Sequence, residues 1–397
     1  MGNMKLHPSK LMGEVKIPPS KSIAHRAVIC SALSKTNKFL KLNLSDDLIA
    51  TSEGMQTLRE GGKVVIDCNE SGSTLRFLIP ISLVLGNGGR FLGRGNLGKR
   101  PLTPFYPIFD QCNIQYEECS NDSLDFRVNG KLISGNYSIS GDISSQFISG
   151  LFFALPLLSG DSTLTITTPL ESKGYLDLTR SVMDEFGVKI EKKENQLYYI
   201  KGNQSYQNQN YEIEGDYSQA AFFLCANSLG SNIKIANLKS NSLQGDKAVL
   251  ELLSKIKEQN TSSLITIDGS QCPDIIPVIA LVAALQEGKK TEIIHAQRLR
   301  LKECDRISAV TQELNKLGAN IKEIADGFYI EGVAQLQGGT EVWSHKDHRI
   351  AMMLSIAATV CKNPIILQDY ECVSKSYPDF FKDYLQLGGI ASEWSMG

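Results

Sequence analysis

The sequence predicts an α/β protein built from two similar domains, and three features of the chain support this fold class. First, the chain has 397 residues, more than the roughly 250–300 that one hydrophobic core organises. Second, helix-length runs of small and aliphatic residues recur six times, each after a short polar cluster. Third, one-sided amphipathic helices and β-branched stretches lie between these runs. Six such repeats cannot share one core, so we expect three in each domain.

The six apolar runs are predicted to be buried helices, because a helix that is apolar on nearly all sides has no face for solvent. Each has Ser, Asp or Gly near its expected first turn, as helix N-caps often do. The runs begin near Ser20, Glu70, Gly141, Gly215, Cys272 and His345.

A second helix type carries apolar residues on one face only, and several of these helices end at glycine, which suits a left-handed C-cap. These amphipathic helices are predicted near residues 48–62, 101–112, 178–187, 246–258, 307–318 and 378–388. Strands are predicted at 63–67, 162–167, 232–235, 263–267, 327–331 and 364–367. The repeating unit is then a strand, an amphipathic helix, a strand, a buried helix and further strand. The Asn-, Gln- and Tyr-rich tract 202–211 predicts a crossover between the domains.

Composition argues against several classes of function. Lys and Arg total 41 against 43 Asp and Glu, a net charge of -2, so no overall field attracts nucleic acid or a membrane surface. The chain starts without the apolar segment of a secretory signal, and no stretch nears the ~18 apolar residues of a membrane span. We therefore expect a cytoplasmic protein that binds anions through local groups of cations.

Cysteine and histidine patterns predict neither a disulfide framework nor a metal site. The nine cysteines are dispersed without a C-x-x-C pair, as is typical of reduced thiols that fill apolar space. His345 and His348 have the spacing of two metal ligands, but no Cys or carboxylate cluster at ordinary spacing completes a site.

The N-termini of the buried helices are the predicted anion sites. Free backbone N–H groups and the helix dipole favour negative charge there. Lys21, Arg26, Arg76 and Arg349 lie at these termini, and Ser144–Gln146 take the same place in the third repeat. For any single helix, Ser and Asp serving only as caps and Arg serving only in ion pairs remains an alternative. Recurrence in register favours anion binding.

Nine motifs carry a resemblance to a known family. They are PSKSIAHR (19–26), SGSTLR (71–76), KRP (99–101), GDISSQF (141–147), ESKGYLDLT (171–179), PDIIP (273–277), RLRLKECDR (298–306), DHRIAM (347–352) and KSYPDF (375–380). Together, and in this order, they resemble the 5-enolpyruvylshikimate-3-phosphate synthases, also called 3-phosphoshikimate 1-carboxyvinyltransferases. The resemblance runs from about residue 4 to 390. Each motif alone is weak, but the ordered set is specific.

The resemblance implies an inverse-barrel, or α–β prism, architecture. It has two similar domains, each of three βαβαββ units with buried and outer helices, and an active site in the interdomain cleft. The implied domains are residues 19–212, on the shikimate 3-phosphate side, and residues 1–18 plus 213–397, on the phosphoenolpyruvate and acid–base side. The sixfold pattern found from the residues agrees with this division.

The implied reaction transfers the enolpyruvyl group of phosphoenolpyruvate to the 5-hydroxyl of shikimate 3-phosphate by addition and elimination, and it releases phosphate. It belongs to chorismate and aromatic amino acid biosynthesis, needs no cofactor, and is carried out by a protein that we expect to be a monomer.

The resemblance also bears on inhibition. The herbicide glyphosate inhibits sensitive members of the family, and Gly72 leaves the space that glyphosate occupies in those enzymes.

Matching motif positions imply the role of each site residue. The residues implied to bind shikimate 3-phosphate are Lys21, Ser22, Arg26, Ser144, Ser145, Gln146, Ser172, Tyr175, Asp274 and Lys302. Those implied to bind phosphoenolpyruvate are Lys21, Gly72, Arg76, Arg100, Gln146, Arg306, Arg349 and Lys375. Asp274, Lys302, Glu303 and Lys21 are implied to be catalytic, with Asp274 and Lys302 ranked first for proton transfer.

Several of these residues have plainer explanations that the sequence alone leaves open. Asp274 has the position of a helix cap, and residues 302–306 have the composition of a solvated charge run. Asp347 is expected to shape the turn that presents Arg349 rather than to bind substrate. Glu70 and Arg298 both stand where many relatives have Asn, and their roles stay undefined.

Two other functions are consistent with a similar fold. UDP-N-acetylglucosamine enolpyruvyl transferases carry a reactive Cys, or Asp, in the loop that here spans 93–101, and this loop has neither residue. A nucleic-acid-binding protein on the same scaffold, as in RNA 3′-terminal phosphate cyclases, is disfavoured by the near-neutral charge and the intact acid–base set.

Overall fold

The computed structural model describes residues 2–34, 45–119, 123–170, 172–194, 196–207, 210–258 and 263–394. The chain forms two compact units: a central unit, Lys21–Ile213, and a terminal unit, Met1–Ser20 with Glu214–Gly397. Each unit has its own apolar core. Residues 208–209 of the predicted crossover and Glu171 of the ESKGYLDLT motif lie outside the described residues.

The central unit contains two four-stranded sheets with one topology. In each, the first two strands are parallel and the last two add in antiparallel fashion. One sheet has the order β3 (Val65–Asp67), β4 (Gly88–Gly93), β6 (Leu124–Asn129), β5 (Gln115–Glu118). The other has the order β7 (Asn136–Ile139), β8 (Ser162–Ile166), β10 (Leu197–Ile200), β9 (Glu191–Lys192).

The terminal unit repeats this topology twice, and the N-terminus of the chain completes one of its sheets. The first sheet has the order β12 (Leu264–Asp268), β13 (Lys290–Ile294), β15 (Gly327–Glu331), β14 (Asn320–Ile324). The second has the order β16 (Glu341–Trp343), β17 (Ile365–Gln368), β1 (Asn3–His7), β18 (Ile390–Trp394). Strand β1 is antiparallel to both neighbours, so it takes the place of the last strand of that repeat. Strands β2 (Met12–Lys16) and β11 (Asn232–Ala236) form a separate parallel pair.

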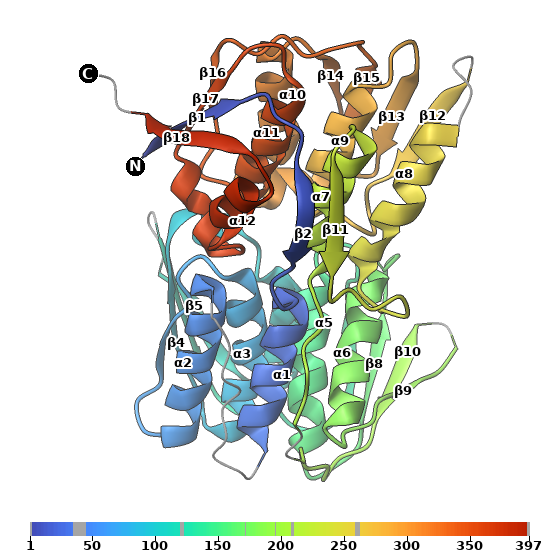
Figure 1. The fold of residues 1–397 in the computed structure, drawn as a ribbon. Helices are drawn as coiled ribbons and strands as arrows, with labels where there is room; N and C mark the ends of the chain where they lie inside the picture. Colours follow the sequence, from blue (N-terminus) through green and yellow to red (C-terminus); the bar gives the residue numbers. More distant parts are fainter. Residues whose placement is uncertain are drawn as a thin grey trace. The chain divides into compact units, whose positions relative to one another are not determined.

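The structure confirms both predicted helix types (Figure 1). The buried helices are α1 (Lys21–Leu33), α3 (Gly72–Leu85), α5 (Ser145–Ala154), α7 (Tyr217–Ser228), α9 (Ile276–Ala284) and α11 (His348–Val360), and every residue of α9 is buried. The amphipathic helices are α2 (Asp46–Glu60), α4 (Tyr106–Gln111), α6 (Lys173–Glu185), α8 (Val249–Glu258), α10 (Arg306–Lys316) and α12 (Phe380–Gln386). Within the described ranges, no helix is both long enough and apolar enough to cross a membrane.

The predicted order of elements within a repeat is wrong in one respect. In each four-stranded sheet the buried helix follows the first strand and the amphipathic helix follows the second, as in β3–α3–β4–α4–β5–β6. The buried helix is thus the crossover between two parallel strands, which needs a connection of this length. Hydrophobic periodicity identifies each helix type but carries no information on which strand begins a sheet.

Helices α3 and α5 of the central unit approach so closely that only glycine fits between them. A Cβ on Gly150 would lie 2.2 Å from the backbone oxygen of Arg76. Gly150 lies one turn after Gln146 on α5, and Gln146 accepts a hydrogen bond from the Arg76 side chain. The close crossing therefore brings these two predicted site residues within reach of each other.

We expect Gly150→Ala to destabilise the protein by about 1–3 kcal/mol, because the two helix backbones must separate. The same separation should weaken binding of any ligand that Arg76 holds. Denaturant unfolding measures the first effect and ligand titration the second. Gly86→Ala is the control, since a Cβ there would lie 3.5 Å from the Ser82 oxygen, an ordinary contact. Equal stability of the two variants would contradict this account of the crossing.

Candidate active site

Gly72 begins α3 and lies among three side chains that the sequence analysis assigned to phosphoenolpyruvate. A Cβ at this position would lie 3.0 Å from Arg100 Nη1 and 3.4 Å from both Arg76 Nη1 and Gln146 Oε1. Arg76 Nη1 donates to Gln146 Oε1 at 2.8 Å, and Gln146 Nε2 donates to Ser73 Oγ at 2.9 Å. These cations meet at a helix N-terminus, where backbone N–H groups also favour an anion.

Lys21, the first residue of α1, has a partner that the sequence analysis missed. Its Nζ lies 2.9 Å from Oδ2 of Asp47, a buried carboxylate in the first turn of α2. A buried carboxylate beside an ammonium group fixes the direction of a long, flexible side chain. The signal in the sequence was the pair Asp46–Asp47 at the start of an amphipathic helix, but a pair of that kind is usual at helix N-termini for electrostatic reasons alone.

Arg26, which was predicted to bind shikimate 3-phosphate, makes several hydrogen bonds within the protein itself. Its guanidinium donates to Thr179 Oγ1 at 2.7 Å, to the Ser22 carbonyl at 2.6 Å and to the Tyr175 carbonyl at 3.2 Å. Burial lowers the Arg26 pKa to about 10. These bonds connect α1 to α6, so Arg26 also has a structural function, and its contact with substrate stays a prediction.

The predicted serine ligands lie at helix ends of the central unit. Ser144 caps α5 and accepts a hydrogen bond from the Gln146 backbone at 3.3 Å, and Ser145 follows it in a buried position. Ser172 precedes α6 with a left-handed φ of 54°, a conformation that is uncommon outside glycine. The ring of Tyr175 lies 5.8 Å from the Arg26 guanidinium carbon.

His25 lies on α1, one turn after Lys21, in a buried network of hydroxyl groups. Its Nδ1 is 2.7 Å from Thr51 Oγ1, which is 2.6 Å from Thr74 Oγ1 on α3. Burial lowers the His25 pKa to about 3. The network joins α1, α2 and α3, and His25 is neutral within it.

This burial predicts a loss of stability in acid. The unfolded chain, with a His pKa near 6.5, takes up a proton that the folded chain excludes until about pH 3. Stability is therefore lost as the pH falls below 6.5, by about 3 kcal/mol at pH 4.5 for this group. Urea unfolding of the wild type and His25→Gln at pH 7.5, 5.5 and 4.5 tests this, because the variant should lose that part of the slope. Identical slopes would exclude His25 as the cause.

In the terminal unit, three predicted site cations converge on Asp274. Lys302 Nζ lies 3.3 Å and Arg306 Nη1 3.0 Å from Asp274 Oδ1, and Arg349 Nη2 lies 3.7 Å from Oδ2. The carboxylate comes just before α9, and Lys302 follows the short helix η5 (Gln297–Leu301). Arg306 is the first residue of α10, and Arg349 lies in the first turn of α11. Segments from two successive repeats therefore supply one cluster.

Arg306 is the centre of this cluster. Besides Asp274, it contacts Glu303 through Nη2 at 2.8 Å and Asp347 through Nε at 2.8 Å. Lys375, at the end of η6 (Tyr370–Lys375), adds its Nζ at 3.6 Å from Glu303 Oε1. Each contact among Arg306, Asp274, Glu303, Asp347 and Lys375 joins a positively charged side chain to a negatively charged one.

Burial and charge together set the pKa values of the two residues ranked first for proton transfer. Burial opposes the charged form of Asp274, but attraction to Lys302, Arg349 and Arg306 outweighs it and holds the Asp274 pKa well below its usual value. Burial also lowers the Lys302 pKa, against the opposing attraction of Asp274. Repulsion by Arg306 and Arg298 lowers the Lys302 pKa further, which places Arg298 close to the cluster.

The structure decides several of the alternatives that the sequence left open. Asp274 is not a cap, because the N-cap of α9 is Ile275 and no side chain bonds there. Residues 302–306 are not a solvated run, since the Arg306 side chain is 2% exposed. Asp347 does cap α11, accepting from the Arg349 backbone at 2.8 Å. Glu70 packs against Gly95, since a Cβ on Gly95 would lie 2.7 Å from Glu70 Oε1.

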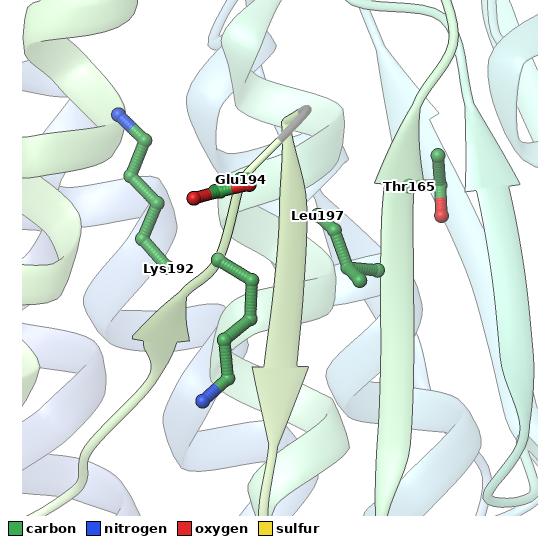
Figure 2. A pocket seen from close by; sticks show the side chains of 5 residues that line it. Thr165, Lys192, Glu194 and Leu197 are labelled. Atoms are coloured by element: carbon green, nitrogen blue, oxygen red, sulfur yellow. The ribbon is translucent and has the colours of Figure 1, made fainter.

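A further hollow in the central unit is unrelated to these clusters. It is lined by Thr165, Lys192, Lys193, Glu194 and Leu197, from β8, β9, β10 and the turn between β9 and β10 (Figure 2). It is an open surface, and its lining includes no residue assigned to either substrate.

Comparison with solved structures defines the fold. An EPSP synthase of Acinetobacter baumannii matches with a TM-score of 0.78 at 22% identity, and the enolpyruvyl transferase NikO of Streptomyces tendae matches with a TM-score of 0.75 at 15% identity. Both matches cover 100% of each chain. The fold is therefore that of the enolpyruvyl transferases.

Comparison of sequences defines the family. The sequence model described as EPSP synthase (3-phosphoshikimate 1-carboxyvinyltransferase) matches residues 6–60 and 38–384. Proteins named 3-phosphoshikimate 1-carboxyvinyltransferase from Clostridium beijerinckii and Clostridioides difficile are each 53% identical to this chain, and each comparison covers 100% of both sequences. The chain belongs to the EPSP synthase family.

Proposed function

We propose that this enzyme transfers the enolpyruvyl group of phosphoenolpyruvate to the 5-hydroxyl of shikimate 3-phosphate and releases phosphate. Family membership supports the reaction, and one structural observation supports it most directly: the convergence of Lys302, Arg306 and Arg349 on Asp274. Such a cluster combines acid–base groups with the fixed positive charge that a phosphate and a carboxylate require.

The two units have different proposed roles, assigned to the domains 19–212 and 1–18 with 213–397. In the first, Ser22, Arg26, Ser144, Ser145, Ser172 and Tyr175 hold shikimate 3-phosphate, and Gly72, Arg76, Arg100 and Gln146 contact phosphoenolpyruvate. In the second, Arg306, Arg349 and Lys375 hold phosphoenolpyruvate, while Asp274, Lys302 and Glu303 carry the proton transfers. Lys21 contacts both substrates.

The cations around Gly72 support the assignment to an anion. Arg76 and Arg100 place guanidinium groups within 3.4 Å of the position of a Cβ on Gly72, and Gln146 places its amide oxygen at the same distance. Absence of a side chain at Gly72 leaves room for a ligand atom between these groups. Planar guanidinium groups suit the carboxylate and phosphate of phosphoenolpyruvate.

In the proposed reaction the 5-hydroxyl oxygen bonds to C2 of phosphoenolpyruvate while C3 gains a proton, giving a tetrahedral intermediate. The C2–O bond to phosphate then breaks as C3 loses a proton, which regenerates the enol double bond. Lys302 suits proton transfer to and from C3, because burial lowers its pKa below that of an ordinary lysine. Asp274 suits the 5-hydroxyl, because its ionised carboxylate can accept the hydroxyl proton as the oxygen bonds to C2.

Binding of phosphoenolpyruvate should also activate Asp274. Without substrate, the Asp274 charge is neutralised by the same Arg306 and Arg349 that we assign to phosphoenolpyruvate. When a substrate anion takes their hydrogen-bond donors, Asp274 loses part of its stabilising charge and its pKa rises toward the usual value. The Asp274 carboxylate therefore becomes a better base once phosphoenolpyruvate is bound.

A phosphate-release assay tests the proposed function. Phosphoenolpyruvate is supplied with shikimate 3-phosphate or with UDP-N-acetylglucosamine, and inorganic phosphate is measured. Release with shikimate 3-phosphate alone is expected, since the loop 93–101 has neither the Cys nor the Asp of the second acceptor's enzymes. Release with the sugar nucleotide alone would overturn the proposal.

We propose further that the enzyme acts as a monomer in the cytoplasm.

A further inference from the structure

The first turn of α7 binds the Arg349 guanidinium through Ser218. The sequence analysis did not assign this turn to substrate binding. Arg349 Nη1 donates to the Ser218 carbonyl and Nη2 donates to Ser218 Oγ, both at 2.8 Å. One turn further along α7, the Phe222 ring lies 5.9 Å from the guanidinium carbon. Ser218, Phe222 and Arg349 are all buried. One helix face therefore fixes two nitrogens and one face of the guanidinium.

Asp216, the N-cap of α7, determines which way the Ser218 hydroxyl can bond. Its Oδ1 accepts from the Ser218 backbone at 2.8 Å and also from the Ser218 hydroxyl. A hydroxyl has one proton, so a hydroxyl that donates to Asp216 can only accept from Arg349. The Asp216 carboxylate thus orients the Ser218 lone pairs toward Nη2.

The contacts with Ser218 leave the Nε–H of Arg349 for other partners. Arg349 Nε is buried and has no hydrogen-bond acceptor among the residues that the structure describes. Nη2 also lies 3.7 Å from Asp274 Oδ2, so the guanidinium bound by Ser218 is next to the acid–base cluster. A guanidinium held by two nitrogens is pre-organised, and less rotational freedom is lost when an anion binds.

We propose that Ser218 is a positioning residue for the donor substrate: its carbonyl and hydroxyl oxygens, the latter oriented by Asp216, hold Arg349 in the geometry that binds phosphoenolpyruvate. This rests on the proposed function of Arg349. Ser218 itself acts through the arginine and not by touching the substrate.

The test is the steady-state kinetics of Ser218→Ala in the full-length enzyme. We expect KM for phosphoenolpyruvate to rise about tenfold, the loss typical of one hydrogen bond to a charged group, while KM for shikimate 3-phosphate changes less than about twofold. Ser218→Cys, a weaker acceptor of nearly the same size, should give an intermediate KM. It also serves as the second variant if the alanine variant folds poorly.

Ser228→Ala is the matched control. Ser228 lies at the other end of α7 and its hydroxyl donates to the Cys225 carbonyl, so its loss should leave both KM values unchanged. Equal rises in both KM values for Ser218→Ala, or an unchanged KM for phosphoenolpyruvate, would overturn the positioning role. Failure of the wild type to release phosphate with shikimate 3-phosphate would instead overturn the proposed function, so the two failures are distinguishable.

Discussion

Lys302→Met is expected to lower kcat about a thousandfold, with smaller changes in either KM. The substitution keeps the length of the side chain but removes the ammonium group that lies 3.3 Å from Asp274. General acid–base groups typically contribute ~10²- to 10⁴-fold to a rate, and a proton donor cannot be replaced by a thioether. Asp274 keeps its contacts with Arg306 and Arg349, so the fold of the cluster should persist.

Steady-state kinetics across pH provides the sharper measurement. Because burial lowers the Lys302 pKa below its ordinary 10.5, kcat of the wild type should fall at alkaline pH with a midpoint below that value. The methionine variant should lack this decline. Lys322→Met, at an exposed position on β14, controls for loss of a lysine from the same unit. A Lys302→Met kcat within tenfold of wild type would remove Lys302 from the acid–base set.

The helices were predictable because each carries its own signal. The buried helices have apolar residues on all sides, and all six lie where the sequence analysis expected them. Their N-terminal polar residues were also found locally, as with Ser71 and Ser144, which both cap helices. The amphipathic segment at 101–112 is shorter than expected, because the helix there breaks into η2 (Thr103–Phe105) and α4.

The partners of the site residues were not predictable, because they come from distant parts of the chain. Ser218 and Arg349 are 131 residues apart, and no periodicity connects them. Lys21 and Asp47 are 26 residues apart on two helices whose packing the pattern does not specify. A partial signal for α7 existed, since Gly215-Asp216-Tyr217-Ser218 repeats the form of the GDIS tetrapeptide at 141–144. That repeat indicated a capped helix, but not what its first turn would hold.

The second large effect is expected for Arg306→Met, which should destabilise the protein by about 3–5 kcal/mol and also abolish turnover. Arg306 is the shared partner of Asp274, Glu303 and Asp347, and its own side chain is 2% exposed. Asp347 is completely buried, so loss of the guanidinium leaves its charge with no solvent to compensate it. Denaturant unfolding of the full-length chain measures the change.

A second substitution separates the effect of buried charge from the effect of lost packing. Asp347→Asn neutralises the buried carboxylate, and asparagine remains a good N-cap for α11. The double variant Arg306→Met/Asp347→Asn should therefore be more stable than Arg306→Met alone, although it stays inactive. A double variant that is no more stable than the single variant would show that the loss came from packing rather than from uncompensated charge.

Arg300→Met provides the matched control, because Arg300 also contacts two carboxylates but at a site open to water. It pairs with Asp305 at 2.7 Å and Glu323 at 3.1 Å, with its side chain 32% exposed. Exposed pairs of this kind contribute about 0–1 kcal/mol, since water replaces the lost partner. The same substitution at Arg306 and at Arg300 should thus differ several-fold in its effect on stability, because burial, more than the number of ion pairs, sets the energy of removing one charge.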